Sequence, residues 1–292
     1  MKKFLASIIA VVLAVSGLSV ISITANAATI FISGNYEYTV NSDDTVNIAG
    51  YKGIATDITI PSQILNKNVV KISANSFYNN STLTSVKIPN TIKVVGSMAF
   101  YGCKNLSSVT LPNTLTEIGY NAFDGTTALT TITIPKTVTT AGNNVFNGSA
   151  LKTAAIENGA TAVADNLFSN AKNLTKVTIP NTVKKVGSMS FYHCEKLSSV
   201  TLPNTLTEIG YSAFNGTTAL TTITIPKTVT KAGIDVFNGS ALKTATIENG
   251  ATAVADNLFS NAKNLTKVTI PNTVKKVGSM SFYHCEKLSS VT

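Results

Sequence analysis

Phenylalanine recurs along this chain at nearly constant intervals, and this regularity limits the folds that are open to it. Successive members of the series are 22 or 23 residues apart, and four intervals add up to a block of 91 residues. Residues 172–201 are identical to residues 263–292, so the block itself recurs. A fixed period of about 20–50 residues indicates a solenoid or a linear array of units. The series is Phe77, Phe100, Phe123, Phe146, Phe168, Phe191, Phe214, Phe237, Phe259 and Phe282.

A single unit has the pattern of a short strand followed by two turns. In the unit LSSVTLPNTLTEIGYNAFDGTTA (106–128), residues 106–111 alternate between apolar and polar side chains, as an exposed strand does. Pro112 lacks a backbone donor and ends the strand. Gly119 permits a turn, and residues 120–123 are predicted to form a short helical or 3-10 turn that carries the phenylalanine into the core.

One such unit cannot fold alone, because the apolar side chains of about twenty residues do not offset the entropy lost on ordering them. Neighbouring units must stack and share their buried faces and strand hydrogen bonds. The strands of successive units should therefore form one parallel β-sheet.

The units share the frame L-x-x-V-x-[IL]-P-x-[ST]-[VL]-x-x-[IV]-G-x-x-[AS]-F, which resembles leucine-rich repeats and, more narrowly, the BspA-like repeats of bacterial surface proteins. The resemblance covers residues 55–292. It implies an α/β-type repeat solenoid: a leucine-rich-repeat-like right-handed coil with one parallel sheet, short second strands and short helical or 3-10 turns. Thr114 stands where leucine-rich repeats place a corner asparagine, so no asparagine ladder is expected.

The fourth unit of each block departs from the frame at two positions. Glu157 and Glu248 replace the proline, and Ala164 and Ala255 replace the glycine.

The two ends of the chain differ from the repeats. Residues 1–27 combine a charged start, an apolar run and a small-x-small site, which predicts a signal peptide cleaved after Ala27 and a secreted or cell-surface protein. An uncleaved membrane anchor is the alternative. Residues 28–54 are predicted to form a β-hairpin that caps the solenoid. The chain stops at Thr292 within a predicted strand, so we expect a C-terminal truncation.

Adjacent histidine and cysteine at His193–Cys194 and His284–Cys285 suggest a nucleophile or a zinc site, but the repeat explains them better. Cys103 occupies the same place in the first block without a histidine beside it. The position two residues after each phenylalanine of the repeat is occupied by histidine, glycine or asparagine. Glycine and asparagine favour the left-handed backbone region, and histidine is also enriched there. Four units separate successive cysteines by about 19 Å, too far for a disulfide or a shared metal ion. We therefore predict structural cysteines, no cofactor and no metal site.

The sequence also lacks the common motifs of catalytic, metal-binding and nucleotide-binding sites. No nucleophile elbow, phosphate loop, HExxH or GxGxxG motif occurs. The formal net charge is +9, yet the chain has no arginine and no tryptophan, which disfavours nucleic-acid binding. This lysine excess favours loose attraction to an anionic cell wall. The chain is predicted not to be an enzyme; a hydrolase would need activity that disappears in Cys194→Ala or Glu208→Gln.

The outward strand positions are the candidate partner-binding face. The resemblance implies adhesion to a host protein, matrix or other cells, and the face offers hydroxyl groups and lysines to an extracellular protein or glycan of unknown identity. Two alternatives stay open: a spacer that projects another domain, and a threonine ladder that matches ice. The candidate residues are Ser85, Lys87, Ser108, Thr110, Thr131, Thr133, Lys176, Thr178, Ser199, Thr201, Thr222, Thr224, Lys267 and Thr269.

Overall fold

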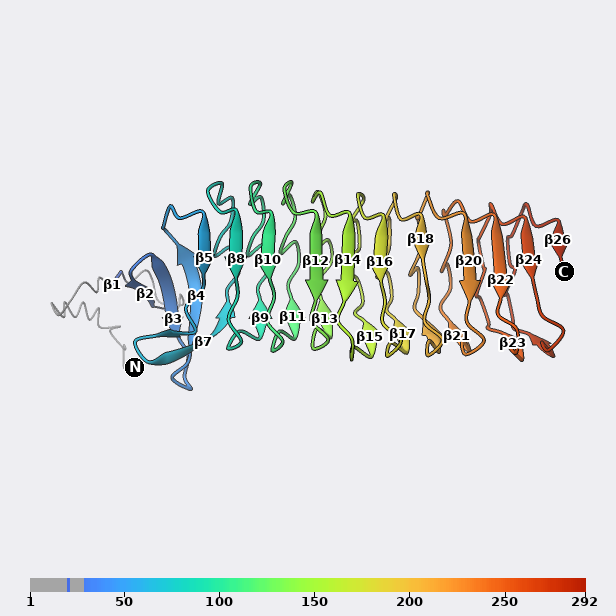
Figure 1. Cartoon of the computed structure of the whole chain (residues 1–292), viewed down its shortest axis with the longest axis horizontal. Coiled ribbons are helices and arrows are strands. Elements are labelled where there is room, and N and C mark those ends of the chain that lie inside the picture. The colour runs from blue at the N-terminus through green and yellow to red at the C-terminus, as the bar shows by residue number, and fades with distance from the viewer. Residues whose placement is uncertain (1–19, 22–28) are drawn as a thin grey trace, which may run out of the picture.

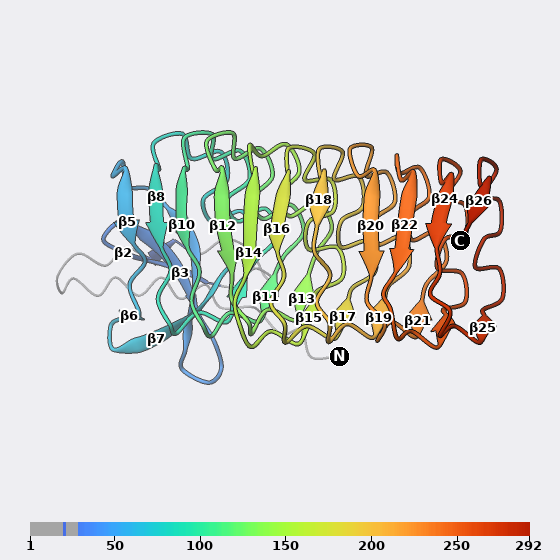
Figure 2. The ribbon, with the colours of Figure 1, turned by 45° about the vertical axis from the view of Figure 1, so that its right-hand side comes forward.

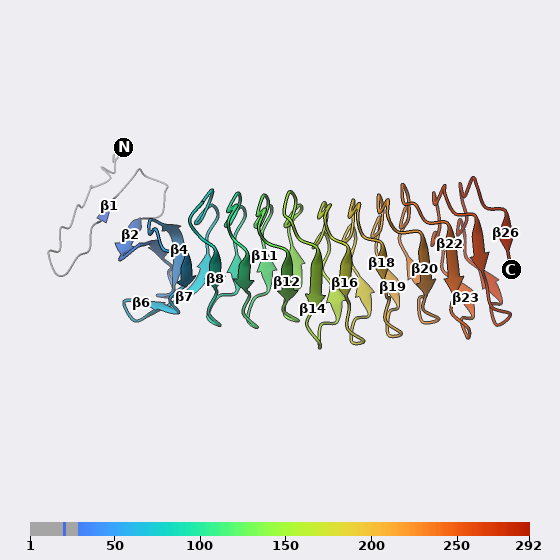
Figure 3. The same cartoon turned by 45° about the horizontal axis from the view of Figure 1, so that its top comes forward.

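A computed structural model shows the repeats stacked side by side along one long axis, each forming one rung of a β-solenoid (Figures 1 and 3). The structure describes residues 20–21 and 29–292. The predicted signal peptide and its cleavage site lie outside the described residues, apart from the pair 20–21. Within the described part of the chain no helix is long and apolar enough to cross a membrane.

Within each sheet the first strands of successive rungs pair in parallel and in register, as the period-two pattern predicts (Figure 2). The strands form three successive sheets of three, four and four strands, not the single sheet that the sequence predicts. The sheets are separated between β10 and β12 and between β18 and β20. These first strands are β5 (Asp57–Thr59), β8 (Ser85–Lys87), β10 (Ser108–Thr110), β12 (Thr131–Ile134), β14 (Thr153–Ile156), β16 (Lys176–Thr178), β18 (Ser199–Val200), β20 (Thr222–Ile225), β22 (Thr244–Ile247), β24 (Lys267–Thr269) and β26 (Ser290–Val291).

A second row of short parallel strands follows the proline corner of the rungs (Figure 2). This row is also divided, between β13 and β15 and between β21 and β23. Its members are β7 (Lys67–Ile72), β9 (Val94–Val95), β11 (Glu117–Ile118), β13 (Thr140–Ala141), β15 (Ala162–Val163), β17 (Lys185–Val186), β19 (Glu208–Ile209), β21 (Lys231–Ala232), β23 (Ala253–Val254) and β25 (Lys276–Val277).

The N-terminal segment continues the second row with antiparallel strands. The strands β1 (Val20–Ile21), β2 (Ile30–Ser33), β3 (Tyr36–Val40) and β4 (Val46–Tyr51) pair in sequence order, and β4 then pairs in parallel with β7. A short hairpin of β6 (Gln63–Ile64) and β7 completes the region. The first rung therefore rests on an antiparallel sheet at this end of the stack.

The helical or 3-10 turn predicted for the segment around each phenylalanine is wrong. Met98 and Gly102 have φ angles of 55° and 67°, so left-handed residues interrupt any helix. Their N–H groups, and that of Phe100, donate to carbonyls of the next rung at 2.7–2.8 Å, whereas the intervening N–H groups bond three residues back. The turns therefore add a ladder of hydrogen bonds between rungs, and no helix occurs among the described residues.

The phenylalanine series forms the centre of the core. Phe77 to Phe259 are at most 2 % exposed, and successive rings stack with centroids 4.9–5.9 Å apart. A stacked aromatic pair contributes roughly 0.5–1.5 kcal/mol beyond its buried area. The ladder thus links every rung to the next.

A glycine at the end of the second strand allows rungs to approach closely, and it also begins the turn that the sequence predicts, since the N–H of Ala122 donates to the carbonyl of Gly119 at 3.3 Å. A Cβ added to Gly119 would lie 2.4 Å from the backbone nitrogen of Ser97 in the preceding rung. The N–H of Gly119 donates to the carbonyl of Val95 at 2.7 Å. The same approach recurs at Gly96, Gly119, Gly142, Gly187, Gly210, Gly233 and Gly278.

The alanines that replace this glycine coincide with the gaps in the second row. Among the described residues, the inter-rung bond of this glycine column is missing at Ala164 and Ala255. The ring spacing is also widest in these units, at 5.9 Å for Phe146–Phe168 and 5.8 Å for Phe237–Phe259. One methyl group therefore explains why β13 and β15, and β21 and β23, do not pair.

A threonine ladder occupies the corner where leucine-rich repeats carry asparagine. The hydroxyl of Thr114 donates to the carbonyl of Ile92 at 2.8 Å, and Thr137 donates to Leu115 at 2.6 Å. The same bond is made by Thr182, Thr205 and Thr273. These hydroxyls bind the corners of five rungs to the rungs before them.

Candidate partner-binding face

Thirteen of the fourteen outward positions predicted from the sequence lie on the first strands, and Thr201 directly follows β18; together they form two rows that follow the solenoid axis. Twelve are exposed, and Ser85 and Thr269 are half-buried. The parallel register aligns them rung by rung, so that Thr131 faces Thr153 and Thr153 faces Lys176. The inward residues Ile132 and Val177 are buried. The alternation of the strand thus separates a polar outer face from the core.

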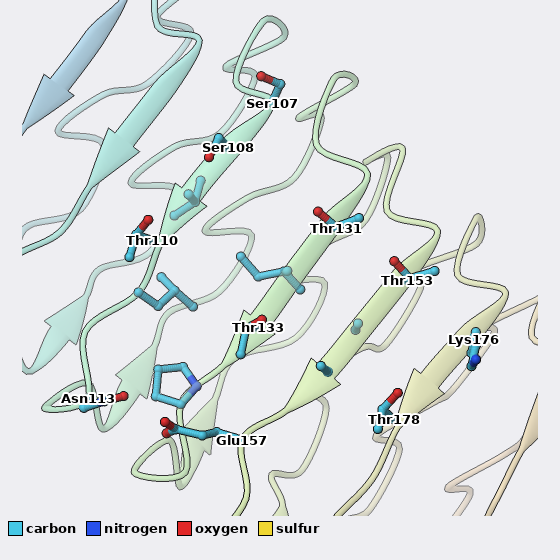
Figure 4. Close-up of a pocket in the computed structure, with 16 residues that line it drawn as sticks. Ser107, Ser108, Thr110, Asn113, Thr131, Thr133, Thr153, Glu157, Lys176 and Thr178 are labelled. Carbon is cyan, nitrogen blue, oxygen red and sulfur yellow. The ribbon is translucent and has the colours of Figure 1, made fainter.

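Six of these residues meet in one groove, which we call groove A (Figure 4). It lies over the gap between β10 and β12, extends across β14 to β16, and encloses about 590 Å³. Its candidate residues are Ser108, Thr110, Thr131, Thr133, Lys176 and Thr178.

Four more candidates meet in an equivalent groove B, over the gap between β18 and β20. Groove B encloses about 540 Å³ and is lined by Ser199, Thr201, Thr222 and Thr224. The remaining candidates, Ser85 and Lys87 on β8 and Lys267 and Thr269 on β24, lie outside both grooves.

Each groove contains a carboxylate that the sequence analysis did not assign to the face. The Oε2 atom of Glu157 accepts a hydrogen bond from the backbone N–H of Lys136 at 3.1 Å, and that of Glu248 accepts one from Lys227 at 2.9 Å. Both glutamates line their grooves. The sequence did indicate these glutamates, since both replace the proline of the frame. Each carboxylate accepts a hydrogen bond from a backbone N–H of the preceding rung.

The histidines occupy the left-handed column that the sequence predicts. His193 has a φ angle of 52° and His284 one of 53°, and Gly102 in the first block has 67°. The His193 ring lies over Gly216 of the next rung and meets the Tyr192 ring edge-on, with centroids 4.3 Å apart. The prediction that this position is a turn is confirmed.

The cysteines are hydrogen-bond donors, with Cys103 and Cys194 buried and Cys285 partly buried. The thiol of Cys103 donates to the carbonyl of Phe77 at 3.0 Å, and the thiols of Cys194 and Cys285 make the corresponding bonds at 3.1 Å. Burial raises the pKa of Cys103 to about 12 and that of Cys285 to about 11, and it raises the pKa of Cys194 further. Within the described residues, no three His, Cys, Asp or Glu side chains gather where a metal ion could bind.

These thiols should make stability fall at high pH. Their folded pKa values lie above the ordinary value of 9.0, so their contribution is complete below pH 9 and is lost as the pH rises toward 11 and 12. We expect the urea midpoint of the wild type to fall more steeply between pH 9 and 11 than that of a triple Cys→Ala variant, which shares all lysines and tyrosines. Equal slopes for the two proteins would contradict this assignment.

Thiol labelling gives a second readout of the same burial. At pH 8, Ellman's reagent should label none of the three cysteines rapidly in the folded chain and all of them in urea. Rapid labelling of folded Cys194 would show a reactive thiolate in place of a structural thiol.

Comparison with known proteins identifies the repeat. The family model for the BspA type leucine-rich repeat region, with six copies, matches residues 70–197 and 161–289. The chain belongs to the BspA-type leucine-rich repeat family. The BspA-type frame therefore explains the regular spacing of strand, corner and phenylalanine in these rungs. No curated protein matches the chain.

Solved structures of leucine-rich repeat proteins share this solenoid fold. A leucine-rich cell surface protein from Faecalibacterium prausnitzii A2-165 is 26% identical, with a TM-score of 0.50 over 91% of this chain and 95% of that one. A leucine-rich repeat protein from Bacteroides ovatus is 25% identical, with a TM-score of 0.54 over 90% of this chain and 76% of that one. These relatives confirm the solenoid.

Proposed function

We propose that this BspA-type protein is exported to the cell surface or secreted, and that it holds a partner protein on the outer face of its first strands without catalysis. The observation that carries the proposal is the pair of exposed hydroxyl and lysine rows, held in register by parallel pairing. Repeated weak contacts on such a face add up by avidity.

Export is supported by the charged and apolar N-terminal pattern and by the surface location named for the Faecalibacterium relative. The absence of catalysis is supported by the roles of the only histidines and cysteines of the chain. They hold turns and fill the core, so neither residue type is placed to act as a nucleophile or a base.

Glutamate substitutions on the face test the proposal. A variant with the exposed residues Lys87, Thr110, Thr133, Thr201, Thr224 and Lys267 changed to Glu reverses the charge of the face without altering the core. We expect adhesion of the purified chain to epithelial cells and to a panel of immobilised matrix proteins to fall at least tenfold. The thermal midpoint should change little, since exposed substitutions are usually worth less than about 0.5 kcal/mol each.

The matched control has the same number of glutamates and the same change of charge beside the second strands, at the exposed residues Thr139, Thr161, Lys184, Thr230, Thr252 and Lys275. This control should adhere like the wild type. Equal losses in both variants would reveal a non-specific charge effect, and no loss in the face variant would contradict a partner-binding face.

The second candidate function is a spacer that holds another domain away from the surface. The unbroken stack of phenylalanine rings favours it, because stacked rungs form a stiff rod. A chain that adheres to no cell or matrix protein in the assay above would support the spacer.

A further inference from the structure

Positive charge gathers along one edge of the solenoid, where loops at the top of Figure 1 lead into the first strands. Four lysines of three neighbouring rungs lie at the starts of β14, β16 and β18 or in the loops just before them, and all four side chains are exposed. We call this set cluster 1. Its members are Lys152, Lys172, Lys176 and Lys196.

Inter-rung hydrogen bonds bring the lysines of cluster 1 together. The N–H groups of Thr175 and Lys176 both donate to the carbonyl of Lys152, at 2.8 and 3.2 Å. The N–H of Lys196 donates to the carbonyl of Lys172 at 3.3 Å. The four lysines therefore form one continuous basic patch across the three rungs.

Two of these ammonium groups are held in place by neighbouring side chains. The Nζ atom of Lys172 lies 2.9 Å from Oε1 of Glu195, and Nζ of Lys196 donates to Oδ1 of Asn173 at 2.8 Å. Among the described residues, Glu195 is the only acidic side chain in an ion pair with cluster 1. The cluster therefore keeps an excess of positive charge that is partly fixed in position.

The same arrangement recurs 91 residues later, in a set that we call cluster 2. The Nζ atom of Lys263 lies 3.1 Å from Oε1 of Glu286, and Nζ of Lys287 donates to Oδ1 of Asn264 at 3.0 Å. Cluster 2 consists of the exposed residues Lys243, Lys263, Lys267 and Lys287.

The fold itself does not require these lysines. In the block before cluster 1, Ser81, Ser85 and Asn105 occupy the positions of Lys172, Lys176 and Lys196. The strands there still pair in register, since Ser85 pairs with Ser108. The lysines therefore add charge to the surface without serving the packing of the rung.

The spacing of the two clusters makes them separate sites. They lie four rungs apart, or about 19 Å at the spacing of parallel strands. At physiological ionic strength charge is screened over about 8 Å, so the fields of the two clusters do not merge. A ligand that uses both must be long, anionic and able to lie along the edge of the solenoid.

We propose that clusters 1 and 2 together bind a linear phosphodiester polymer of the cell wall, which holds the exported chain at the cell surface. The inference rests on the export that the proposed function includes, and it supplies the means of retention. The sequence predicted a loose attraction from the lysine excess of the whole chain. The structure gathers eight of the 23 lysines into two equal sites on one edge.

The chemistry of the clusters favours phosphate groups over sugars or bases as the recognised feature. Lysine binds phosphate as a compact point charge. Neither cluster includes an aromatic ring on which a sugar or a base would stack, and the chain has no arginine to form a bidentate fork. A polymer that presents regularly spaced phosphates on a flexible backbone fits these sites best.

A polymer that reaches from one cluster to the other gains from binding twice. The second contact forms at an effective concentration set by the polymer segment between the clusters, which raises the affinity by about 10²–10⁴ over that of one cluster. A glycerol phosphate dimer is too short to span about 19 Å and can occupy only one cluster.

The probe is poly(glycerol phosphate) of about twenty repeats, immobilised and titrated with the full chain at an ionic strength of about 0.15 M. We expect serine substitution of three lysines in either cluster to weaken binding at least tenfold, and the six-serine variant to show no measurable binding. The substitutions are Lys152→Ser, Lys172→Ser and Lys196→Ser in cluster 1, and Lys243→Ser, Lys263→Ser and Lys287→Ser in cluster 2.

The matched control removes the same charge from the other sides of the solenoid. Its six exposed lysines lie on or beside the second strands or directly after the prolines of the frame, and this variant should bind within threefold of the wild type. The control changes Lys93, Lys136, Lys184, Lys227, Lys231 and Lys275 to serine.

The length of the polymer reports on the use of both clusters. In the wild type the twenty-repeat polymer should bind at least a hundredfold tighter than the glycerol phosphate dimer. This gain should disappear in either three-serine variant, because only one cluster is left.

Three results would overturn the proposal. Equal losses in the six-serine variant and its control would show that net charge alone attracts the polymer. Tighter binding of heparin or of DNA than of poly(glycerol phosphate) would assign the clusters to another polyanion. Affinity that does not depend on polymer length would refute joint use of the two clusters.

The adhesion assay of the proposed function is a separate readout. The six-serine variant keeps Lys176, Lys267 and every hydroxyl of the outer face, so it should still adhere to matrix proteins while it no longer binds the polymer. A face that binds no partner protein would leave the polymer result unchanged.

Discussion

Replacing Phe191 with alanine should destabilise the chain by about 3–5 kcal/mol, the usual range for truncating a buried phenylalanine. The Phe191 side chain is fully buried, and its ring stacks on Phe168 at 5.6 Å and on Phe214 at 5.1 Å. The cavity would lie in the middle of the ladder, where rungs on both sides are fixed and cannot collapse into it. Urea unfolding followed by circular dichroism measures the effect.

Tyr192 provides the control for this experiment because it follows Phe191 directly and is only half-buried. Tyr192→Ala should cost about 1 kcal/mol or less. If the two substitutions cost the same, the phenylalanine ladder would not be the core that links the rungs.

Replacing Gly210 with alanine should cost about 2 kcal/mol or more, although it adds a single methyl group. The new Cβ would lie 2.4 Å from the backbone nitrogen of Ser188, and backbone cannot move aside as a side chain does. Overpacking of this kind costs about 1–3 kcal/mol. Separation of the rungs would also break the 2.8 Å bond from Gly210 to Val186, worth about 1 kcal/mol.

The reverse substitution can be made at Ala255, which occupies the position of Gly210 in another rung. Ala255→Gly should change the free energy of unfolding by less than about 1 kcal/mol, since a restored hydrogen bond offsets the extra chain entropy of glycine. Slower amide exchange at residue 255 in this variant would show that β21 and β23 had closed together. A Gly210→Ala variant as stable as the wild type would refute close approach as the role of this glycine.

The sequence predicted those features that every rung repeats. The alternation in residues 106–111 predicted the outward and inward faces of β10, and the Gly–Asn–His column predicted the left-handed turn at His193. Each position of the repeat occurs about ten times, so its equivalents in other rungs show which kind of side chain it requires. This holds even where a single residue, such as Cys194, suggests a reactive site. The repeats of one chain can therefore be compared with one another as aligned sequences would be.

The features that the sequence did not predict depend on how one rung meets the next. The backbone of Asn121 is left-handed in the turn before Phe123, a conformation that asparagine favours. Met98 and Met189 occupy the same position in other rungs, so the residue types there did not reveal the left-handed turn. The helical turn was therefore predicted wrongly. The turn at Gly119 was predicted, but the close approach of this glycine to Ser97 was not, because Ser97 lies 22 positions earlier in the sequence.

The gap between β10 and β12 has no local signal that we can identify, since Ser108 and Thr131 are both ordinary strand residues. It depends on the spacing of whole rungs. For the same reason the sequence identified the outward hydroxyls of groove A but not their convergence with Glu157 in one groove.

Distances between spin labels test the stacked arrangement most directly. With the native cysteines replaced by alanine, labels at Ser108 and Ser199 lie four rungs apart, and labels at Ser85 and Lys267 lie eight rungs apart. The stack predicts narrow distributions near 19 Å and 38 Å between the labelled backbone positions, so the distance doubles with the number of rungs. A broad distribution, or an eight-rung distance no longer than the four-rung one, would contradict a solenoid of equivalent rungs.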